Sequence, residues 1–128
     1  MKEPIWISKE IILAIHSELT ARFGGANDLR DESLLDSAIA RPQQLFAYGE
    51  PNLNEMAAVY AEGIVKNHPF LDGNKRTGFM AAYVFLAANG TQLTASEEQA
   101  VLQTLALAAG EIGAKEYGVW LAANSRPR

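Results

Sequence analysis

The sequence predicts an all-α protein: a single-domain bundle of about six helices around one buried central helix. Apolar residues recur at helical spacing along most of the 128 residues. The segments with this spacing are bounded by capping residues, glycines and prolines. Only residues 5–7 and 92–94 have strand character, and both are too short to build a sheet. We therefore expect residues 1–128 to form one domain.

The first two helices have clear start signals. Ser8 is the predicted N-cap of the first helix, which ends at glycines 24 and 25. Asp31 is the predicted N-cap of a short second helix that reaches Ala40. Pro42 is expected to end this helix, because proline lacks an amide donor and clashes with the preceding turn.

The later helices follow the same logic. Asn54 is the predicted cap of a third helix ending near residue 67, and a fourth should run from residue 73 or 74 to residues 89–90. The fourth is apolar almost all round beyond Gly78, so we expect it to be the central helix. Two more helices are predicted, one from the capping pair Ser96 and Gln99 to residue 109 and one over 114–123.

Composition and charge exclude several classes of protein. The net charge of −4 argues against a nucleic-acid-binding surface. The longest apolar run covers residues 79–88, well short of the roughly 20 residues of a membrane span. There is no cysteine for a disulfide, and no basic segment followed by an apolar one that would indicate a signal peptide. A cytoplasmic protein without direct nucleic-acid or membrane contacts is expected.

The segment over residues 68–78 has the strongest functional signal. Pro69 disfavours helical geometry at His68, so the third helix should end there and His68 should project from a short loop. Phe70 is the predicted apolar anchor of this loop. Gly73 permits a tight turn into the next helix, and is expected to contact phosphate.

The first turn of the fourth helix is a predicted phosphate site. The amides of Asn74, Lys75 and Arg76 lack partners within the helix, and the helix dipole adds positive potential. Both basic side chains supply further charge. Asp72 would oppose a phosphate directly, so we expect it to hold a bridging Mg²⁺. His68 is the predicted general base for a hydroxyl nucleophile.

Each of these residues has a plainer interpretation when taken alone. Asp72 or Asn74 could be a simple N-cap, His68 a surface histidine, and the basic pair solvated. Their joint occurrence in this order favours a site. Elsewhere, His16 is predicted to be a structural boundary residue. Two arginines, at positions 30 and 41, are predicted to pair with acidic residues between positions 31 and 36.

Residues 68–78 resemble the signature of the Fic/Doc superfamily, H-x-F-x-[D/E]-G-N-x-R. The residues that match are His68, Phe70, Asp72, Gly73, Asn74 and Arg76. Residues 29–43 are similar to the region upstream of this signature in the Doc (death on curing) branch. The resemblance covers about residues 29–90 and implies the Fic fold.

Two positions differ from the Fic proteins that transfer AMP. Those proteins carry a glycine after the signature asparagine and a second arginine three positions beyond the first, where this chain has Lys75 and Phe79. Doc members share the lysine and lack the second arginine. This implies a kinase that uses ATP and Mg²⁺ and phosphorylates a protein Ser or Thr. Gly73 stands where Doc has alanine, so AMP transfer remains the first alternative.

The resemblance also implies a biological setting. Doc toxins inactivate a translation elongation factor by phosphorylation, and an antitoxin with a disordered C-terminal tail restrains them. The chain lacks an inhibitory helix of the [S/T]-x-x-x-E-[G/N] type, so restraint is expected from such a partner. A second alternative is a non-catalytic module that binds a helical peptide. A nuclease is disfavoured by the acidic charge and by the lack of a second acid or base near His68.

Overall fold

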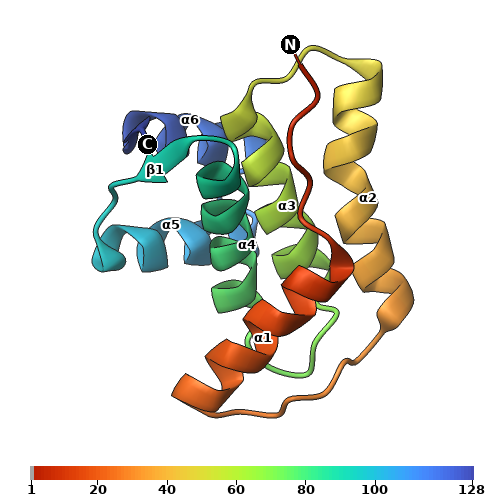
Figure 1. The fold of residues 1–128 in the computed structure, drawn as a ribbon. Coiled ribbons are helices and arrows are strands. Elements are labelled where there is room, and N and C mark those ends of the chain that lie inside the picture. Colours follow the sequence, from red (N-terminus) through yellow and green to blue (C-terminus); the bar gives the residue numbers. More distant parts are fainter. Residues whose placement is uncertain (1) are drawn as a thin grey trace.

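The computed structural model describes residues 2–128. Their elements are α1 (Lys9–Phe23), α2 (Glu32–Tyr48), α3 (Leu53–Asn67), α4 (Asn74–Ala88), β1 (Thr91–Leu93), α5 (Glu97–Ala109), α6 (Ala114–Ala123) and β2 (Ser125–Pro127). The helix α3 lies at the centre of the protein, and α2, α4, α5 and α6 pack directly on it, while α1 packs on α4 and α2 (Figure 1). The predicted all-α bundle is confirmed. None of the helices in this part of the chain has both the length and the apolar character needed to cross a bilayer.

The prediction that the fourth helix is the central one is wrong. Helix α4 buries much of its surface, but α3 packs against four other helices and α4 against three, because small residues let other helices approach α3 closely. Ala57, Ala58 and Ala61 are fully buried. On the side of α2, a Cβ added to Gly63 would lie only 3.0 Å from the Cβ of Ala38. Small side chains on several faces therefore decide which helix is central.

The prediction that Pro42 ends the second helix is also wrong. The helix continues through Pro42 to Tyr48. A proline inside a helix forfeits one backbone hydrogen bond and costs about 3 kcal/mol. The turns that follow bring Leu45 and Phe46 against the core. Burying such side chains contributes about 1.5–3 kcal/mol each when complete, which offsets the cost of the proline.

Helix α3 begins two residues earlier than predicted. Asn52 is its N-cap: the Asn52 side chain accepts a hydrogen bond from the Glu55 amide, and the Glu55 carboxylate accepts one from the Asn52 amide. This capping box satisfies two amides. The predicted cap, Asn54, has Ala57 three positions later, which cannot reciprocate.

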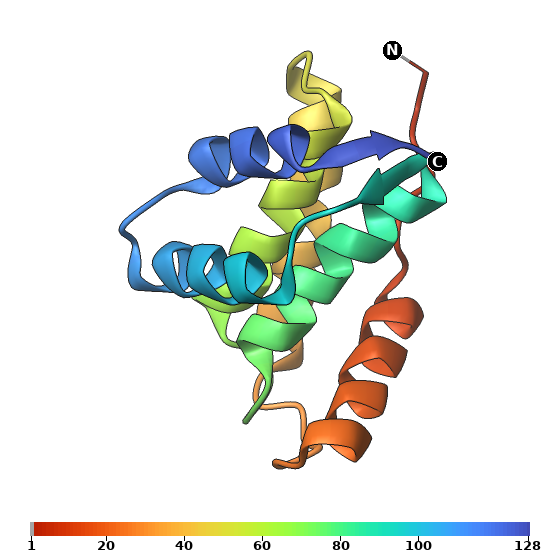
Figure 2. The same ribbon diagram turned by 90° about the vertical axis from the view of Figure 1, so that its left-hand side faces the viewer.

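A short antiparallel pair closes the end of the bundle where the chain terminates (Figure 2). Gln92 of β1 lies opposite Arg126 of β2. The second strand was not predicted, because pairing depends on where α4 and α6 end in space. Residues 5–7, which had the other strand-like pattern, form no strand. The Ile7 amide instead donates to the Tyr60 hydroxyl in the core at 3.1 Å.

Candidate active site

The motif loop, residues 68–73, joins α3 to α4 beside α1 (Figure 1). His68 caps α3 in the left-handed conformation, with φ 55° and ψ 53°. Among the described residues it is the one non-glycine residue with a positive φ. Such a conformation costs on the order of 1–3 kcal/mol and persists only where the surroundings enforce it. Here the His68 amide donates to the Ile64 carbonyl at 3.1 Å, and the His68 carbonyl accepts from Arg30 Nε at 2.7 Å.

The His68 side chain is left free by this arrangement. The residue is exposed, and within residues 2–128 its imidazole has no hydrogen-bond partner. The backbone is therefore held on both sides while the ring remains available to a ligand. That combination suits a general base, which must reach the proton of its substrate.

The segment over residues 28–31 clamps the motif loop from the side of α2. Leu29 forms an isolated antiparallel bridge with Phe70. The amides of Arg30 and Asp31 both donate to the Pro69 carbonyl, at 2.6 and 3.0 Å. A chain segment some forty positions away thus fixes the course of the loop.

The predicted pairing of the two arginines with acids between positions 31 and 36 is wrong. Arg30 instead donates to backbone carbonyls at the C-terminal end of α3, to His68 through Nε and to Asn67 through a terminal nitrogen at 3.0 Å. Those carbonyls lack helical donors, so a cation there is favourable. Arg41 pairs with Glu62 on α3 at 2.6 Å. Tertiary contacts offer both arginines partners that sequence proximity does not reveal.

Asn74 closes the motif loop with its side chain. Its carboxamide accepts from the Phe70 amide at 3.0 Å and donates to the Phe70 carbonyl at 2.8 Å. Both residues are buried, at 3% and 1% exposure. The Asn74 side chain is therefore committed to the loop, and its backbone amide is the group that remains for a phosphate.

The first turn of α4 presents unpaired backbone amides. Gly73 precedes the helix at φ 80° and ψ 17°, and the first helical hydrogen bond runs from the Thr77 amide to the Gly73 carbonyl at 2.9 Å. The amides at positions 74–76 therefore point beyond the end of the helix. A left-handed residue followed by helical ones forms a concave nest of N–H groups that suits an anion.

Asp72 turns its carboxylate toward the loop that follows α1. Its Oδ2 accepts from the Ala26 amide at 2.9 Å. Its Oδ1 has no partner in the described chain, and no three acidic, histidine or cysteine side chains of that chain cluster as metal ligands. One free carboxylate oxygen next to an anion nest fits Mg²⁺ that arrives with a nucleotide, because Mg²⁺ commonly takes one or two carboxylates, phosphate oxygens and water.

The two basic side chains lie on different sides of the α4 start. Lys75 faces α5 and lines a pocket. Arg76 faces α1, where its guanidinium lies over the ring of Phe23, 5.1 Å from the centroid. A phosphate chain above the α4 amides would have a cation on either side.

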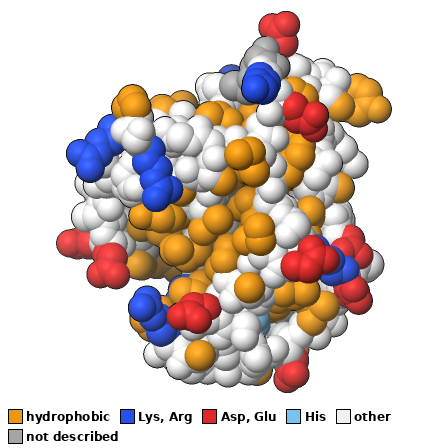
Figure 3. Space-filling model, viewed as in Figure 1, with side chains coloured by type: hydrophobic (Ala, Val, Ile, Leu, Met, Phe, Trp, Pro, Cys, Tyr) orange, Lys and Arg blue, Asp and Glu red, His pale blue; other side chains and the backbone are white. Residues whose placement is uncertain are grey.

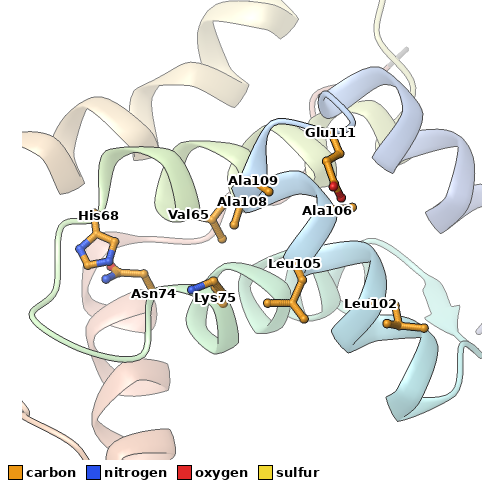
Figure 4. A pocket seen from close by; sticks show the side chains of 10 residues that line it. All are labelled: Val65, His68, Asn74, Lys75, Leu102, Leu105, Ala106, Ala108, Ala109 and Glu111. Carbon is orange, nitrogen blue, oxygen red and sulfur yellow. The ribbon is translucent and has the colours of Figure 1, made fainter.

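A pocket of about 580 Å³ lies between the motif loop, the first turn of α4 and α5. This volume is within the range of small-molecule sites. Figure 4 shows His68 at one end, Leu102 at the other and Lys75 between them. The other lining residues are Val65, Asn74, Leu105, Ala106, Ala108, Ala109 and Glu111. Asp72 does not line it, so the structure gathers His68, Asn74 and Lys75 here and leaves Asp72 and Arg76 on the α1 side.

The α5 wall of this pocket was not identified from the sequence. Leu102 and Leu105 are 60% and 46% exposed, and the face in Figure 3 shows hydrophobic side chains around a hollow in this region. The available signal was that Leu102 and Leu105 lie off the helical face that carries Ala100, Thr104 and Leu107.

The sequence model of the Fic/DOC family matches residues 6–86. This chain belongs to the Fic/DOC family. Among curated proteins, "Toxin Doc" of Mycolicibacterium smegmatis is 47% identical over 76 residues, which cover 57% of this chain and 58% of that protein. "Protein kinase doc" of Escherichia phage P1 is 38% identical over 107 residues, covering 83% and 84%. The chain thus spans just over half of the first relative and most of the second, and both place it in the Doc branch.

This Fic/DOC chain also has a site residue whose position the sequence did not indicate. His16 of α1 was predicted to lie at the core boundary, but it is 2% exposed and sits under the motif loop. Its ring stacks on Phe70 at 3.7 Å, and its Nε2 is 2.7 Å from the Asp72 carbonyl oxygen. A histidine on the apolar side of an amphipathic helix was the only available signal.

Proposed function

We propose that the protein is a Doc-type toxin that transfers the γ-phosphate of ATP to a Ser or Thr hydroxyl of a target protein. The observation that carries the proposal is that His68 and the first turn of α4 open onto one pocket. Membership of the Doc branch supports it, as does the 38% identity to a protein named as a kinase. The proposed target is a translation elongation factor, whose modification would halt growth.

The site residues divide the chemistry of transfer between them. His68 removes the proton of the acceptor hydroxyl, whose oxygen forms a bond to the γ-phosphorus as the bond to the β–γ bridging oxygen breaks. ADP leaves. The backbone amides of residues 73–76 and the side chains of Lys75 and Arg76 balance the phosphate charge. Asp72 would hold Mg²⁺, which supplies Lewis-acid stabilisation of the phosphate oxygens.

Two positions favour phosphate over AMP as the transferred group. Phe79 packs against the core, so α4 carries no guanidinium there that could hold the terminal phosphates as a leaving group. Lys75 puts a long side chain into the pocket. Both features favour a nucleotide whose γ-phosphate meets the acceptor.

A toxin of this kind requires restraint by a partner. We propose a separate antitoxin whose disordered C-terminal tail folds on the toxin, and action in the cytoplasm. The relative named as a toxin supports this. A growth assay with and without the neighbouring reading frame tests it: rescue by a small co-expressed protein is expected, and no toxicity of the chain alone would contradict it.

Labelled ATP distinguishes the possible reactions. The wild-type protein with Mg²⁺, cell lysate and γ-labelled ATP should label one protein, and α-labelled ATP should not. His68→Ala should lower the rate by about 10²- to 10⁴-fold. Lys115→Ala, an exposed change on α6, is the matched control and should act as wild type. Transfer of α-label would indicate an AMP transferase, and toxicity without any label transfer would indicate a peptide-binding module.

A further inference from the structure

His16 makes two contacts with the motif loop, and one of them holds a backbone carbonyl. Its ring stacks on Phe70, tilted by only 7°, and its Nε2 lies 2.7 Å from the Asp72 carbonyl oxygen. The same edge of the ring lies against Gly73, where an added Cβ would be 3.6 Å from Nε2. His16 therefore stacks on Phe70, two residues before Asp72, and holds the carbonyl oxygen of the Asp72–Gly73 peptide bond.

The hydrogen bond determines the proton on the ring. A carbonyl oxygen only accepts, so Nε2 of His16 must carry the hydrogen. It also determines the direction of the peptide. In a planar trans peptide the N–H points opposite to the C=O. Because His16 on α1 holds the Asp72 carbonyl, the Gly73 amide points away from α1.

That amide is the first of the series at the start of α4. Gly73 has the left-handed conformation that joins the loop to the helical amides at positions 74–76. Rotation of the Asp72–Gly73 peptide would turn one N–H out of the series. The buried donor of His16 on α1 thus sets the direction of the Gly73 amide, which the residues of the motif do not set by themselves.

We propose that His16 is a positioning residue, which aims the Gly73 amide at a phosphate of the nucleotide through the Asp72 carbonyl. This inference rests on the proposed function, because it assumes that the α4 amides bind phosphate. It assigns His16 no contact with the nucleotide. The positioning role depends on the donor at Nε2. A purely structural role would depend on the stacking of the ring as much as on the donor.

Two variants separate the donor from the ring. His16→Phe keeps an aromatic ring over Phe70 and removes the donor. His16→Gln removes the ring and keeps an N–H near the position of Nε2. Tyr117→Phe is the matched control: it removes one buried hydrogen bond, to Thr104 at 2.8 Å, on the helix that packs against the opposite end of α3.

The experiment titrates each 15N-labelled variant with Mg·ATP and follows the Gly73 amide by NMR, with kcat and KM for phosphate transfer measured in parallel. His16→Phe should bind Mg·ATP roughly 10- to 100-fold more weakly, the range for lost supporting contacts. Its Gly73 amide should show little shift at saturation. His16→Gln should stay within about threefold of wild type, and Tyr117→Phe should be unchanged.

Several outcomes would overturn the inference. One is a wild-type Gly73 response in folded His16→Phe; another is a loss in His16→Gln as large as in His16→Phe. If His16→Phe does not fold, His16→Gln decides alone: near wild-type binding supports the donor, and a loss rejects it. Wild-type binding of Mg·ATP without transfer to any protein would contradict the kinase and leave the inference standing, whereas no binding at all would overturn both.

Discussion

The two ends of α3 satisfy their backbone groups in opposite ways. At the N-terminal end Asn52 and Glu55, three residues apart, cap each other's amides. At the C-terminal end the carbonyls of Asn67 and His68 are met by Arg30, 37 and 38 positions away. The N-terminal end is capped by neighbouring residues of the sequence. The C-terminal end is capped by a residue that only folding brings close.

This difference explains why the candidate active site lies at the C-terminal end of α3. A locally capped helix end is stable wherever it is placed, but it holds nothing else in position. The C-terminal end keeps His68 in a strained left-handed conformation, which requires contacts from distant segments. The same contacts align the motif loop with the start of α4. The comparison therefore predicts that changes at the C-terminal end affect phosphate transfer, and that changes at the N-terminal end affect stability alone.

Among changes to the residues that support the motif loop and the two ends of α3, the largest effect is expected from Asn74→Ala. This change leaves the buried amide and carbonyl of Phe70 without partners, which should lower the free energy of unfolding by roughly 2–4 kcal/mol. Release of the motif loop should lower phosphate transfer on the order of 100-fold. Urea denaturation and γ-label transfer measure the two effects. A stable variant with full activity would show that the loop does not need this clasp.

Arg30→Ala should have a smaller effect, mainly on activity. Arg30 is exposed, so its hydrogen bonds to the α3 carbonyls contribute little to stability, but they hold the His68 backbone. We expect kcat/KM to fall about tenfold as His68 loses its alignment. Arg41→Ala breaks the ion pair between α2 and Glu62, which also lies on α3, and should leave kcat/KM unchanged. Equal losses in both variants would contradict the comparison.

Alkaline pH should destabilise the protein through Tyr117. Burial raises the pKa of this residue to about 12, whereas the unfolded chain ionises near pH 10. The free energy of unfolding should therefore be maintained below pH 10 and fall by roughly 2–3 kcal/mol as the pH rises to 12. Burial also raises the pKa of Tyr60, which acts in the same direction. Denaturation at pH 8 and 11.5 should show a smaller loss in Tyr117→Phe than in wild type; equal losses would exclude Tyr117 as the cause.

The smallest effect is expected at the N-terminal end of α3. Asn52→Ala removes one half of the capping box and should lower the free energy of unfolding by about 1 kcal/mol. Phosphate transfer at 25 °C should be unchanged, because the motif loop has its own supports. A thermal melt and the label assay measure this. A tenfold loss of activity would mean that the two ends are coupled.

Much of the fold was predictable because the signals are local. Helical spacing with caps at Ser8, Asp31 and Ser96 located three helix starts, and each side chain accepts the expected amide bond. The errors came where distant packing outweighed local preference. Pro42 lies inside α2 because the residues beyond it bury against the core, and β2 exists because α6 ends next to β1.

The sequence by itself determined the helical class, the family signature and the residue types needed around a phosphate. It placed His68, Asp72 and the α4 amides within one short segment, because a turn into a helix is a local structure. Only the tertiary structure decided that Lys75 faces the pocket while Asp72 and Arg76 face α1, and that His16 and Arg30 support the loop. The physical reason is that such contacts join backbone groups to side chains up to 56 positions away. No pattern along the chain specifies which distant donor satisfies a given carbonyl.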